Sequence, residues 1–476
     1  MVAVAEQLEL QEKIQHVFEA QKKNAQYIAL SSADERINKL KKLLKWVEDN
    51  EQKIKKGLYN DFKKHPDEVM IGEVLGVSGE IKHAIKNLKK WMRLQKQATP
   101  ITMLGSSSYV KLEPKGTVLI IAPWNYPFLL LVKPLVHAIA AGNTAIVKPS
   151  ELTPHISAVL RDMIAELFAP GEVALLEGDA TVAEQLLALP FDHIFFTGSP
   201  NVGKVVMAAA AKHLASVTLE LGGKSPCIVD ETADLKTSAE RIAWGKCINN
   251  GQTCIAPDYL FVHEKVRDEL LKEIKSSIEK MYNSDGKGIE QSEYYCRIVN
   301  KRHFNRIIGL IDDAVLKGAK VEFGGQMNET DRYVSPTILS DVSDEMKVMQ
   351  EEIFGPILPI QTFQSMDEVL NAINKRPKPL ALYLMSKSKQ TVDYVLNRTS
   401  AGGTVINDLM IHIGNAEVPF GGVNNSGIGK SNGYWGFKEF SNERAVMKQI
   451  FGSFKIVYPP YTETTSKIVK FLVKWF

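Results

Sequence analysis

The chain contains few cysteines, and their spacing argues against a metal centre or a disulfide framework. Its 476 residues include four cysteines, at Cys227, Cys247, Cys254 and Cys296. No two of them form the C-x-x-C pair that zinc and iron–sulfur sites use, so we expect no metal ligands. A low cysteine content is also typical of proteins from a reducing compartment, which favours a cytoplasmic location.

A strong net charge and a long uninterrupted apolar run are absent as well. The net charge of +3 is too small to indicate binding to nucleic acid. The most apolar stretch, residues 116–147, is interrupted by Lys133 and His137, which argues against a membrane-spanning helix. Charged residues follow directly after residues 1–5, so no secretory signal is expected. Hydrophobic residues make up 45% and charged residues 24% of the chain, as in soluble globular proteins of several domains.

The N-terminal part of the chain has a helical pattern over residues 6–95. Ser32 and Glu35 stand three residues apart, as the two members of a helix capping box do. After them, apolar residues recur on one helical face at Ile37, Leu40, Leu44 and Val47. Helices are therefore expected before the first strand.

From Gly116 the pattern changes to alternating strands and helices. Strands are expected at 117–121, 144–148, 173–176, 193–197 and 217–221, with helices at 128–141, 181–189 and 201–214. Strand–helix–strand alternation indicates a parallel sheet, and its repetition predicts a doubly wound, dinucleotide-binding layout. A second alternating block spans about 222–407, with strands near 226–229, 259–263, 357–363, 380–386 and 403–406.

Cys254 stands at the junction between a helical stretch and a strand. The spacing predicts a helix over 233–249, a turn over 249–251 and a strand that begins at Tyr259. A nucleophilic thiol needs such a place, where rigid elements fix its direction, a loop leaves one side open and neighbours favour the thiolate. The alternative is a buried structural cysteine, which is the commoner role for an isolated cysteine.

Four other short stretches carry side chains suited to related chemistry. Asn125 lies in a turn between two prolines, where its amide can donate to a developing oxyanion. Gly198 follows a strand and opens a helix whose N-terminus can bind phosphate. Lys148 and Glu151 follow a strand and can reach a ribose. Glu220 precedes two glycines at the boundary between the two α/β blocks, as a general base over a cleft would. Taken singly, each also fits a plain turn residue or a solvated charge.

Together these stretches resemble the NAD(P)-dependent aldehyde dehydrogenase superfamily over nearly the full length of the chain. The matching motifs, in the family's order, are Pro123-Trp124-Asn125, Lys148-Pro149-Ser150-Glu151, Phe196-Thr197-Gly198-Ser199 with Gly203, Glu220-Leu221-Gly222-Gly223-Lys224, Gly251-Gln252-Thr253-Cys254, Glu351-Glu352-Ile353-Phe354-Gly355-Pro356 and Pro419-Phe420-Gly421-Gly422. The segment 256–259 after the cysteine, and the lack of a long N-terminal extension, resemble the class 3 branch, which acts on fatty and aromatic aldehydes.

This resemblance implies an α/β, aldehyde dehydrogenase-like fold. It has two doubly wound α/β domains, one for the cofactor and one for catalysis, and a small oligomerisation arm that implies a homodimer. The implied boundaries are 1–97 and 115–220 for the dinucleotide-binding domain, 221–430 for the catalytic domain, 98–114 and 431–450 for the arm, and 451–476 for a C-terminal tail.

The resemblance also implies roles for individual residues. Cys254 is the implied nucleophile, which forms a thiohemiacetal with the aldehyde and, after hydride transfer to the nicotinamide, a thioester. Asn125 and the backbone N–H of Cys254 hold the oxyanion, and Glu220 activates the water that releases the acid. The implied cofactor contacts are Trp124, Lys148, Glu151, Gly198, Ser199, Gly203, Glu352 and Phe354. NAD is favoured, because a carboxylate at Glu151 accepts a ribose hydroxyl and repels a phosphate, although class 3 enzymes use NAD or NADP.

The implied activity is the NAD(P)-dependent oxidation of an apolar aldehyde to its carboxylic acid. The aldehyde is medium- or long-chain aliphatic, aromatic or apocarotenoid, and the residues do not distinguish among these. The alternatives are a CoA-acylating relative and a catalytically silent protein that retains the fold. Glu220 argues against the first, and the intact set of Cys254, Glu220 and Asn125 argues against the second.

The C-terminal tail has the pattern of a short basic amphipathic helix. Apolar residues share one helical face: Ile468, Phe471, Leu472 and Trp475. Lysines share another: Lys467, Lys470 and Lys474. The segment is too short to span a bilayer. Peripheral contact with a membrane, and packing on this chain or on a partner subunit, explain the pattern equally well.

Overall fold

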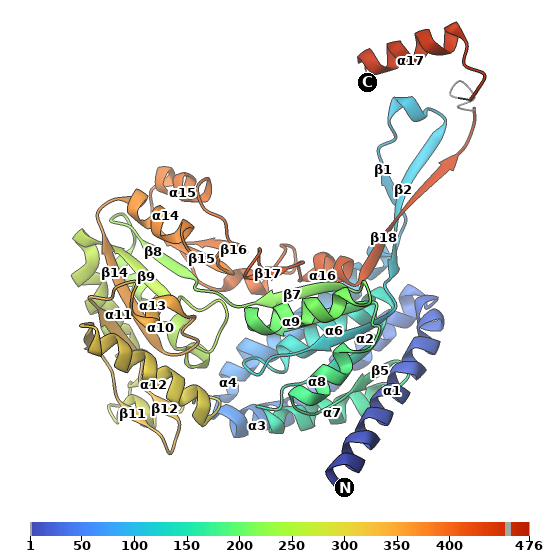
Figure 1. Ribbon diagram of the computed structural model, residues 1–476. Coiled ribbons are helices and arrows are strands. Elements are labelled where there is room, and N and C mark those ends of the chain that lie inside the picture. The colour runs from blue at the N-terminus through green and yellow to red at the C-terminus, as the bar shows by residue number, and fades with distance from the viewer. Residues whose placement is uncertain (1, 453–457, 476) are drawn as a thin grey trace.

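The computed structural model describes residues 2–452 and 458–475. Figure 1 shows two α/β units side by side, with an arm of strands that extends from the first of them. The chain forms the first unit, passes through the second, and returns to the first before it completes the arm. The α/β fold class predicted from the sequence is therefore confirmed.

The first unit is built around a six-stranded sheet in the order β17-β7-β6-β3-β4-β5. Its strands are β3 (Thr117–Ile121), β4 (Thr144–Lys148), β5 (Val173–Leu175), β6 (His193–Gly198), β7 (Ser216–Leu221) and β17 (Gly427–Ile428). They run parallel except for β17, which pairs antiparallel with β7. Every residue of β3 and β4 is buried, and burial on both faces explains why these strands read as nearly continuous apolar runs.

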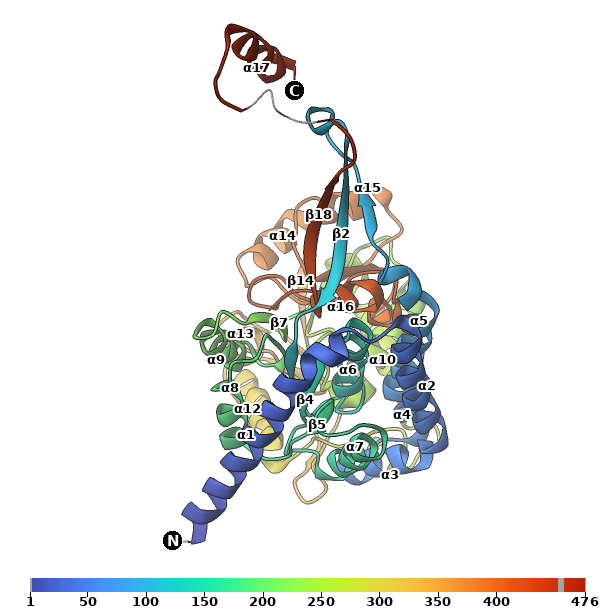
Figure 2. The same ribbon diagram turned by 90° about the vertical axis from the view of Figure 1, so that its right-hand side faces the viewer.

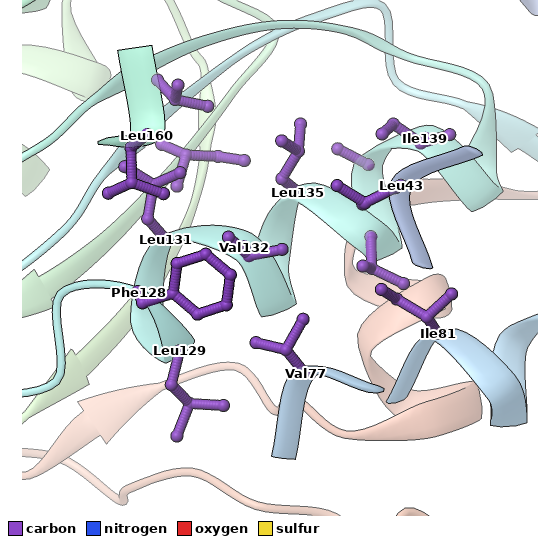
Figure 3. Close-up of a cluster of buried hydrophobic side chains, with 14 of the residues drawn as sticks. Leu43, Val77, Ile81, Phe128, Leu129, Leu131, Val132, Leu135, Ile139 and Leu160 are labelled. Carbon is purple, nitrogen blue, oxygen red and sulfur yellow. The ribbon is translucent and has the colours of Figure 1, made fainter. Parts of the chain in front are cut away.

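Helices cover both faces of this sheet. The helices of the first unit are α1 (Val2–Ala29), α2 (Ala33–Asp49), α3 (Glu51–Phe62), α4 (Pro66–Val69), the π-helix η1 (Met70–Val74), α5 (Leu75–Trp91), α6 (Leu129–Ala141), α7 (Pro154–Leu167), α8 (Ala180–Leu187), α9 (Pro200–Ala211) and α16 (Gly433–Glu439). On one face, Val132 and Ile139 of α6 share a buried cluster with Val77 and Ile81 of α5 and Leu43 of α2 (Figure 3). Residues of α1, α8 and α9 form a separate buried cluster over the other face.

The second unit is built around a seven-stranded sheet in the order β10-β13-β14-β9-β8-β15-β16. Its strands are β8 (Pro226–Val229), β9 (Tyr259–His263), β10 (Lys320–Phe323), β13 (Thr337–Ser340), β14 (Ile357–Phe363), β15 (Ala381–Met385) and β16 (Gly403–Ile406). All neighbours are parallel except β10 and β13. Its helices are α10 (Leu235–Cys247), α11 (Arg267–Tyr282), α12 (Lys301–Leu316), α13 (Lys347–Gln350), α14 (Met366–Asn374) and α15 (Lys389–Leu396). A separate hairpin consists of β11 (Met327–Asn328) and β12 (Tyr333–Val334).

The arm is a three-stranded antiparallel sheet that projects from the first unit (Figure 2). It consists of β1 (Gln95–Gln97), β2 (Ser106–Pro114) and β18 (Ser441–Gln449). The predicted C-terminal helix is present as α17 (Glu463–Trp475), which lies beyond the tip of the arm and buries none of its residues. This position argues against packing on the body of its own chain. Among the described helices, none combines the length and the apolar character needed to cross a membrane.

Two details of the second unit differ from the sequence analysis. The helix predicted over 233–249 is shorter, because it begins at Leu235 after the Asp234 cap and ends at Cys247. Strands β10 and β13 were not anticipated. Each has only four residues, and β10 alternates charged with apolar side chains at the exposed edge of the sheet, so neither gives a strong strand pattern.

The predicted domain boundaries stay predictions, and two segments pack across them. Within the predicted arm segment 431–450, Phe437 and Phe440 are buried in the core of the first unit. Within the predicted catalytic segment 221–430, β17 pairs with β7 of the first sheet. Both segments supply residues that meet Glu220 near the end of β7: Gly427 pairs with it in the sheet, and Ser431 donates a hydrogen bond to its side chain.

Candidate active site

The turn before Cys254 holds three consecutive residues in the left-handed conformation. Asn249, Asn250 and Gly251 have φ angles of 50°, 56° and 69°, which asparagine and glycine tolerate better than most residues. A Cβ atom on Gly251 would collide with the carbonyl oxygen of Gly355. The turn therefore ends α10 and directs the chain into the loop that carries the thiol.

The polar side chains of Glu68, which is half-buried, and Gln252, which is buried, hold this turn in place. Glu68 accepts a hydrogen bond of 2.9 Å from the N–H of Asn249. Gln252 donates to the carbonyl oxygens of Asn249 and Arg297 at 3.0 and 3.1 Å, and it accepts from the N–H of Val299 at 2.9 Å. The sequence analysis assigned neither role, because Gln252 appeared only within a motif and no local pattern marks Glu68.

The Cys254 side chain is half-buried, whereas the other three cysteines are buried. Burial raises the pKa of the Cys254 thiol, and the nearby carboxylates of Glu352 and Glu220 raise it further. Hydrogen bonds from the backbone N–H groups of Cys254 and Ile255 oppose this shift of the pKa. In this structure burial and the two carboxylates thus oppose the thiolate, and the expected activation of the thiol stays a prediction.

Glu220 lies near the C-terminal end of β7, opposite Gly427 of β17. Its side chain is 7% exposed, and its Oε1 accepts a hydrogen bond of 3.0 Å from Ser431 Oγ. Within the described residues, its Oε2 has no hydrogen-bond partner. Burial raises the pKa of Glu220 to about 8, although Ser431, Lys430 and Lys133 lower it in part. A buried carboxyl with a free oxygen and a pKa near neutrality is suited to proton transfer.

The side chain of Asn125 is buried beside the cysteine loop. Its Nδ2 donates to the backbone carbonyl oxygen of Gln252 at 3.1 Å. The side-chain Nδ2 of Asn249 in turn donates to the backbone carbonyl oxygen of Asn125 at 2.9 Å. The hydroxyl of the next residue, Tyr126, lies 3.0 Å from Thr253 Oγ1. Because an amide nitrogen carries two N–H groups, Asn125 can donate to a second acceptor.

Glu352 reaches the same region from the loop before β14. Its carboxylate lies against Gly222, where a Cβ atom would overlap it, and it accepts a hydrogen bond from the N–H of Gly223. Burial raises the pKa of Glu352 to about 8, repulsion from Asp258 adds to this, and Lys224 opposes it. Of the described atoms, none is a hydrogen-bond partner of its Oε1. Gly222 and Gly223, the glycine pair, thus leave room for the Glu352 carboxylate, which has one free oxygen.

Several predicted cofactor residues lie at the C-terminal ends of strands in the first sheet. Lys148 ends β4, and its Nζ lies 3.4 Å from the carboxylate of the exposed Glu151. Gly198 ends β6, and Ser199 caps α9 by accepting a hydrogen bond from a backbone N–H. A Cβ atom on Gly203 would collide with a side chain of β7. The end of a strand and the start of a helix are where α/β folds bind dinucleotides.

The remaining two predicted cofactor residues belong to one aromatic group. The Trp124 ring centroid lies 5.3 Å from that of Phe354 and 4.8 Å from that of His303. Phe354 has a φ angle of 48°, which is uncommon for a bulky residue and is typical of functional sites. Burial lowers the pKa of His303 to about 4, so this ring is neutral at pH 7.

A cavity of about 830 Å³ brings Cys254 and Glu220 into one wall. Its lining is mainly apolar and aromatic and includes Ile71, Leu75, Tyr126, Leu129, Leu130, Phe195, Trp244, Ile248, Met410, Ile411 and Phe420. Cavities of this size and character accept small organic ligands. Asn125 and Glu352 are not among the residues that line this cavity.

A charged cluster forms the polar part of the cavity wall. Glu80 lies 3.0 Å from His137 Nε2 and 3.6 Å from Lys133 Nζ, and it accepts a hydrogen bond of 2.8 Å from the N–H of Gly433. Burial acts to raise the pKa of Glu80, but His137 and Lys133 outweigh it and hold the pKa at about 2. In the sequence, Lys133 and His137 stand out only as interruptions of an apolar run. In the described ranges, no group of three His, Cys, Asp or Glu side chains is placed to hold a metal ion.

Comparisons with known proteins show which sequences and structures the chain is similar to. The model of the aldehyde dehydrogenase family matches residues 4–446. The 4,4'-diaponeurosporen-aldehyde dehydrogenase of Staphylococcus aureus is 46% identical over 427 residues, which cover 90% of this chain and 92% of that protein. Aldehyde dehydrogenase family 3 member A2 of Mus musculus is 43% identical over 445 residues, which cover 93% and 90%. A solved structure described as the substrate-bound state of Staphylococcus aureus AldH matches with a TM-score of 0.91 at 43% identity, and the match covers 96% of this chain and 99% of that one.

Proposed function

Because the chain belongs to the aldehyde dehydrogenase family, whose members oxidise aldehydes, we propose that it oxidises an apolar aldehyde to the carboxylic acid through Cys254. The observation that carries this proposal is the apolar cavity of about 830 Å³ whose wall contains both Cys254 and Glu220. A mainly apolar lining helps to exclude water from the substrate chain. Medium- and long-chain aliphatic, aromatic and apocarotenoid aldehydes all have the required chemistry.

In the proposed mechanism, the sulfur of Cys254 attacks the carbonyl carbon, and its proton passes to the carboxylate of Glu220 in the same wall and from there to solvent. Asn125 and the backbone N–H of Cys254 donate to the resulting oxyanion, and one such donor typically contributes about 3 kcal/mol to lowering the barrier. When bound, the nicotinamide cofactor accepts the hydride that leaves the substrate carbon. The thioester on Cys254 then reacts with a water molecule, whose proton Glu220 removes through its free oxygen. The carboxylic acid and the thiol of Cys254 are the products of this last step.

We propose that Glu352, Lys148 and Glu151 hold the cofactor, with the helix N-terminus at Ser199 near its phosphates. Glu352 Oε1 is enclosed and has no partner among the described atoms, and the chain approaches it closely at Gly222, which fits a ribose whose hydroxyl donates to this oxygen. Lys148 is buried at the end of β4 and is a cation that can donate to a ribose oxygen. NAD is the expected cofactor, because the carboxylate of Glu151 would repel the extra phosphate of NADP.

Two alternatives predict a different outcome of the reaction. A CoA-acylating enzyme would release an acyl thioester of CoA, and a silent protein would form no product. The free oxygen of Glu220 beside the apolar cavity favours hydrolysis by water over both. We also propose a homodimer, in which the arm of β1, β2 and β18 contacts the partner subunit.

An assay of cofactor reduction tests the activity and the nucleophile together. The purified chain is incubated with NAD or NADP and with butanal, dodecanal or benzaldehyde, and the reduced cofactor is followed by its absorbance. We expect NAD reduction with an apolar aldehyde, abolished in Cys254→Ala. The matched control Cys247→Ala removes a thiol that is buried in α10 and should keep the activity. Reduction that requires CoA, or that persists in Cys254→Ala, would contradict the proposal.

The C-terminal helix supports a second, separate proposal of peripheral membrane contact. In α17, Phe471 and Trp475 are 58% and 63% exposed, and the lysines of the other face suit anionic lipid. We expect the chain to co-sediment with vesicles that contain phosphatidylserine, and deletion of 461–476 to remove this binding. If deletion instead changes the oligomeric state and leaves vesicle binding as it was, the helix packs on a partner subunit.

A further inference from the structure

The segment 431–433 joins the carboxyl group of Glu220 to the charged cluster in the cavity wall. Its first residue, Ser431, donates a hydrogen bond of 3.0 Å to Glu220 Oε1. Its next residue, Asn432, accepts a hydrogen bond from Lys133 Nζ through the side-chain Oδ1. Lys133 belongs to α6 and Glu220 to β7, and both line the same cavity. The segment therefore connects a helix and a strand that border the proposed reaction site.

The backbone of this segment has an uncommon conformation. Asn432 has φ and ψ angles of 75° and 131°, a region that residues with a Cβ atom rarely adopt. The N–H of Gly433 donates to Glu80 Oε1 at 2.8 Å, and a Cβ atom on Gly433 would collide with the carbonyl oxygen of Ala416. Backbone conformations of this kind persist where the surroundings impose them, and Lys133 and Glu80 supply two of the contacts that do so.

Lys133 uses its three N–H groups within the protein. Its Nζ donates to Asn432 Oδ1 and to the carbonyl oxygen of Ile413 at 3.3 Å, and it lies 3.6 Å from Glu80 Oε2. An ammonium group has three N–H donors, so these three acceptors account for all of them. Lys133 is also only 8% exposed. The cluster is therefore suited to fixing other residues rather than to binding a polar group of the substrate.

Charged and titratable groups reach Glu220 from several other parts of the chain. Lys133 comes from α6, Lys430 from the loop after β17, Glu439 from α16, and the Cys254 thiol from the opposite unit. Burial raises the pKa of Glu220 to about 8, the two lysines act against this shift, and Glu439 adds to it. Lys133 differs from the other groups because its side chain also holds the segment that supplies the hydrogen bond to Oε1.

We propose that Lys133 is a positioning residue for the general base Glu220. Anchored by Glu80, it holds Asn432 in place. The hydroxyl of Ser431, the preceding residue, then donates to Oε1 of Glu220 and leaves Oε2 free for proton transfer. The positive charge of Lys133 in the same wall also stabilises the ionised carboxylate. This inference rests on the proposed role of Glu220 in aldehyde oxidation, and Lys133 itself touches no reacting atom.

The variant Lys133→Met tests this role, because methionine has a side chain of similar length with neither a charge nor a donor. Loss of a nearby cation disfavours a carboxylate, so the pH midpoint of the rate should rise by about one unit. The rate at pH 7 should then fall by roughly tenfold, whereas KM for NAD should not change. Lys133→Arg keeps the charge and can donate to the same acceptors, so its midpoint should stay near that of the unchanged protein.

The matched control is Lys246→Met. Lys246 is another buried lysine, and its Nζ donates to a backbone carbonyl oxygen, that of Pro257, at 3.2 Å. It belongs to α10 and is not among the residues that line the cavity. The control should lose stability but keep the pH midpoint. An equal rise of the midpoint in both methionine variants would overturn the inference, because any lost buried cation would then have the same effect.

Infrared titration of the Glu220 carboxyl group separates this inference from the proposed activity. The band of the protonated carboxyl, assigned by its loss in Glu220→Gln, is followed against pH without aldehyde or cofactor. A higher midpoint in Lys133→Met than in Lys246→Met supports the positioning role even if no aldehyde is oxidised. The same midpoint in these two variants, or a midpoint in Lys133→Arg as high as in Lys133→Met, would overturn it.

A second variant covers the case in which thermal unfolding shows that Lys133→Met is not folded. Lys133→Gln keeps one polar donor group in the cluster and removes only the charge and part of the length. Its infrared midpoint, compared with that of Lys246→Met, then decides. A higher midpoint supports the positioning role of Lys133, and an unchanged midpoint overturns it.

Discussion

Two glutamates near Cys254, one in the cavity wall and one outside it, have a pKa raised to about 8 in different surroundings. On the cavity side, Glu220 receives a hydrogen bond from Ser431 and has one free oxygen in an apolar wall. On the other side, Glu352 lies against the glycine pair and is repelled by Asp258. The same residue type with the same pKa can therefore have different roles, which are set by what each free oxygen faces. In the proposed mechanism, Glu220 transfers a proton and Glu352 binds a hydroxyl.

The raised pKa values fix the sign of the pH dependence. The ordinary carboxyl value is 4.5, and burial moves the folded-state pKa of Glu220 and Glu352 to about 8. Between these values the folded state holds protons that the unfolded chain has released, so both groups make the fold less stable as the pH rises from 4.5 to 8. A general base works only when deprotonated, so the rate that depends on Glu220 rises as the pH passes through about 8.

The largest effect that separates the two sides is expected from Glu220→Gln. The amide keeps an oxygen that can accept from Ser431 but has no basicity, so hydrolysis of the thioester should slow by about 10²- to 10⁴-fold. The rise of the rate through pH 8 should disappear with it. Steady-state rates from pH 6 to 9.5, together with single-turnover formation of reduced cofactor, measure both. An unchanged pH profile in the variant would assign the titration to another group.

A smaller effect is expected from Glu352→Gln on the other side. The substitution removes the charge but keeps a hydrogen-bond acceptor, so KM for NAD should rise by roughly tenfold, the scale of one charged hydrogen bond. The rate of Cys254 alkylation by iodoacetamide should not fall, because loss of this carboxylate removes a cause that raises the pKa of the thiol. If Glu352→Gln instead abolished the rise of the rate through pH 8 and left KM for NAD unchanged, the two glutamates would have exchanged roles.

The sequence identified both glutamates but not the residues that make them different. Glu220 precedes two glycines at the boundary between the two α/β blocks, whereas Glu352 was implied only by the family resemblance of its motif, so short stretches of sequence were sufficient to propose both. Ser431 and Glu80 act through partners far away in the chain, and the hydrogen bond from Gly433 to Glu80 joins residues 353 positions apart. The bond from Asn249 to Glu68 joins residues 181 positions apart. Such contacts have no period and no fixed spacing, so only the folded arrangement reveals them.

The smallest effect concerns the hydroxyl that distinguishes the two carboxylates. Ser431 lowers the pKa of Glu220 by donating to Oε1, so Ser431→Ala should move the pH profile toward higher pH. At pH 7 less Glu220 would be ionised, and the rate should fall by about fivefold, the net worth of one hydrogen bond. KM for NAD, which reports on the Glu352 side, should not change.

Ser441→Ala is the matched control, because Ser441 is also buried and donates to a carbonyl oxygen, that of Phe437, away from the cavity. A shift of the profile in both variants would point to a general loss of stability, whereas a shift in Ser431→Ala alone assigns the difference between the two glutamates to this single hydroxyl.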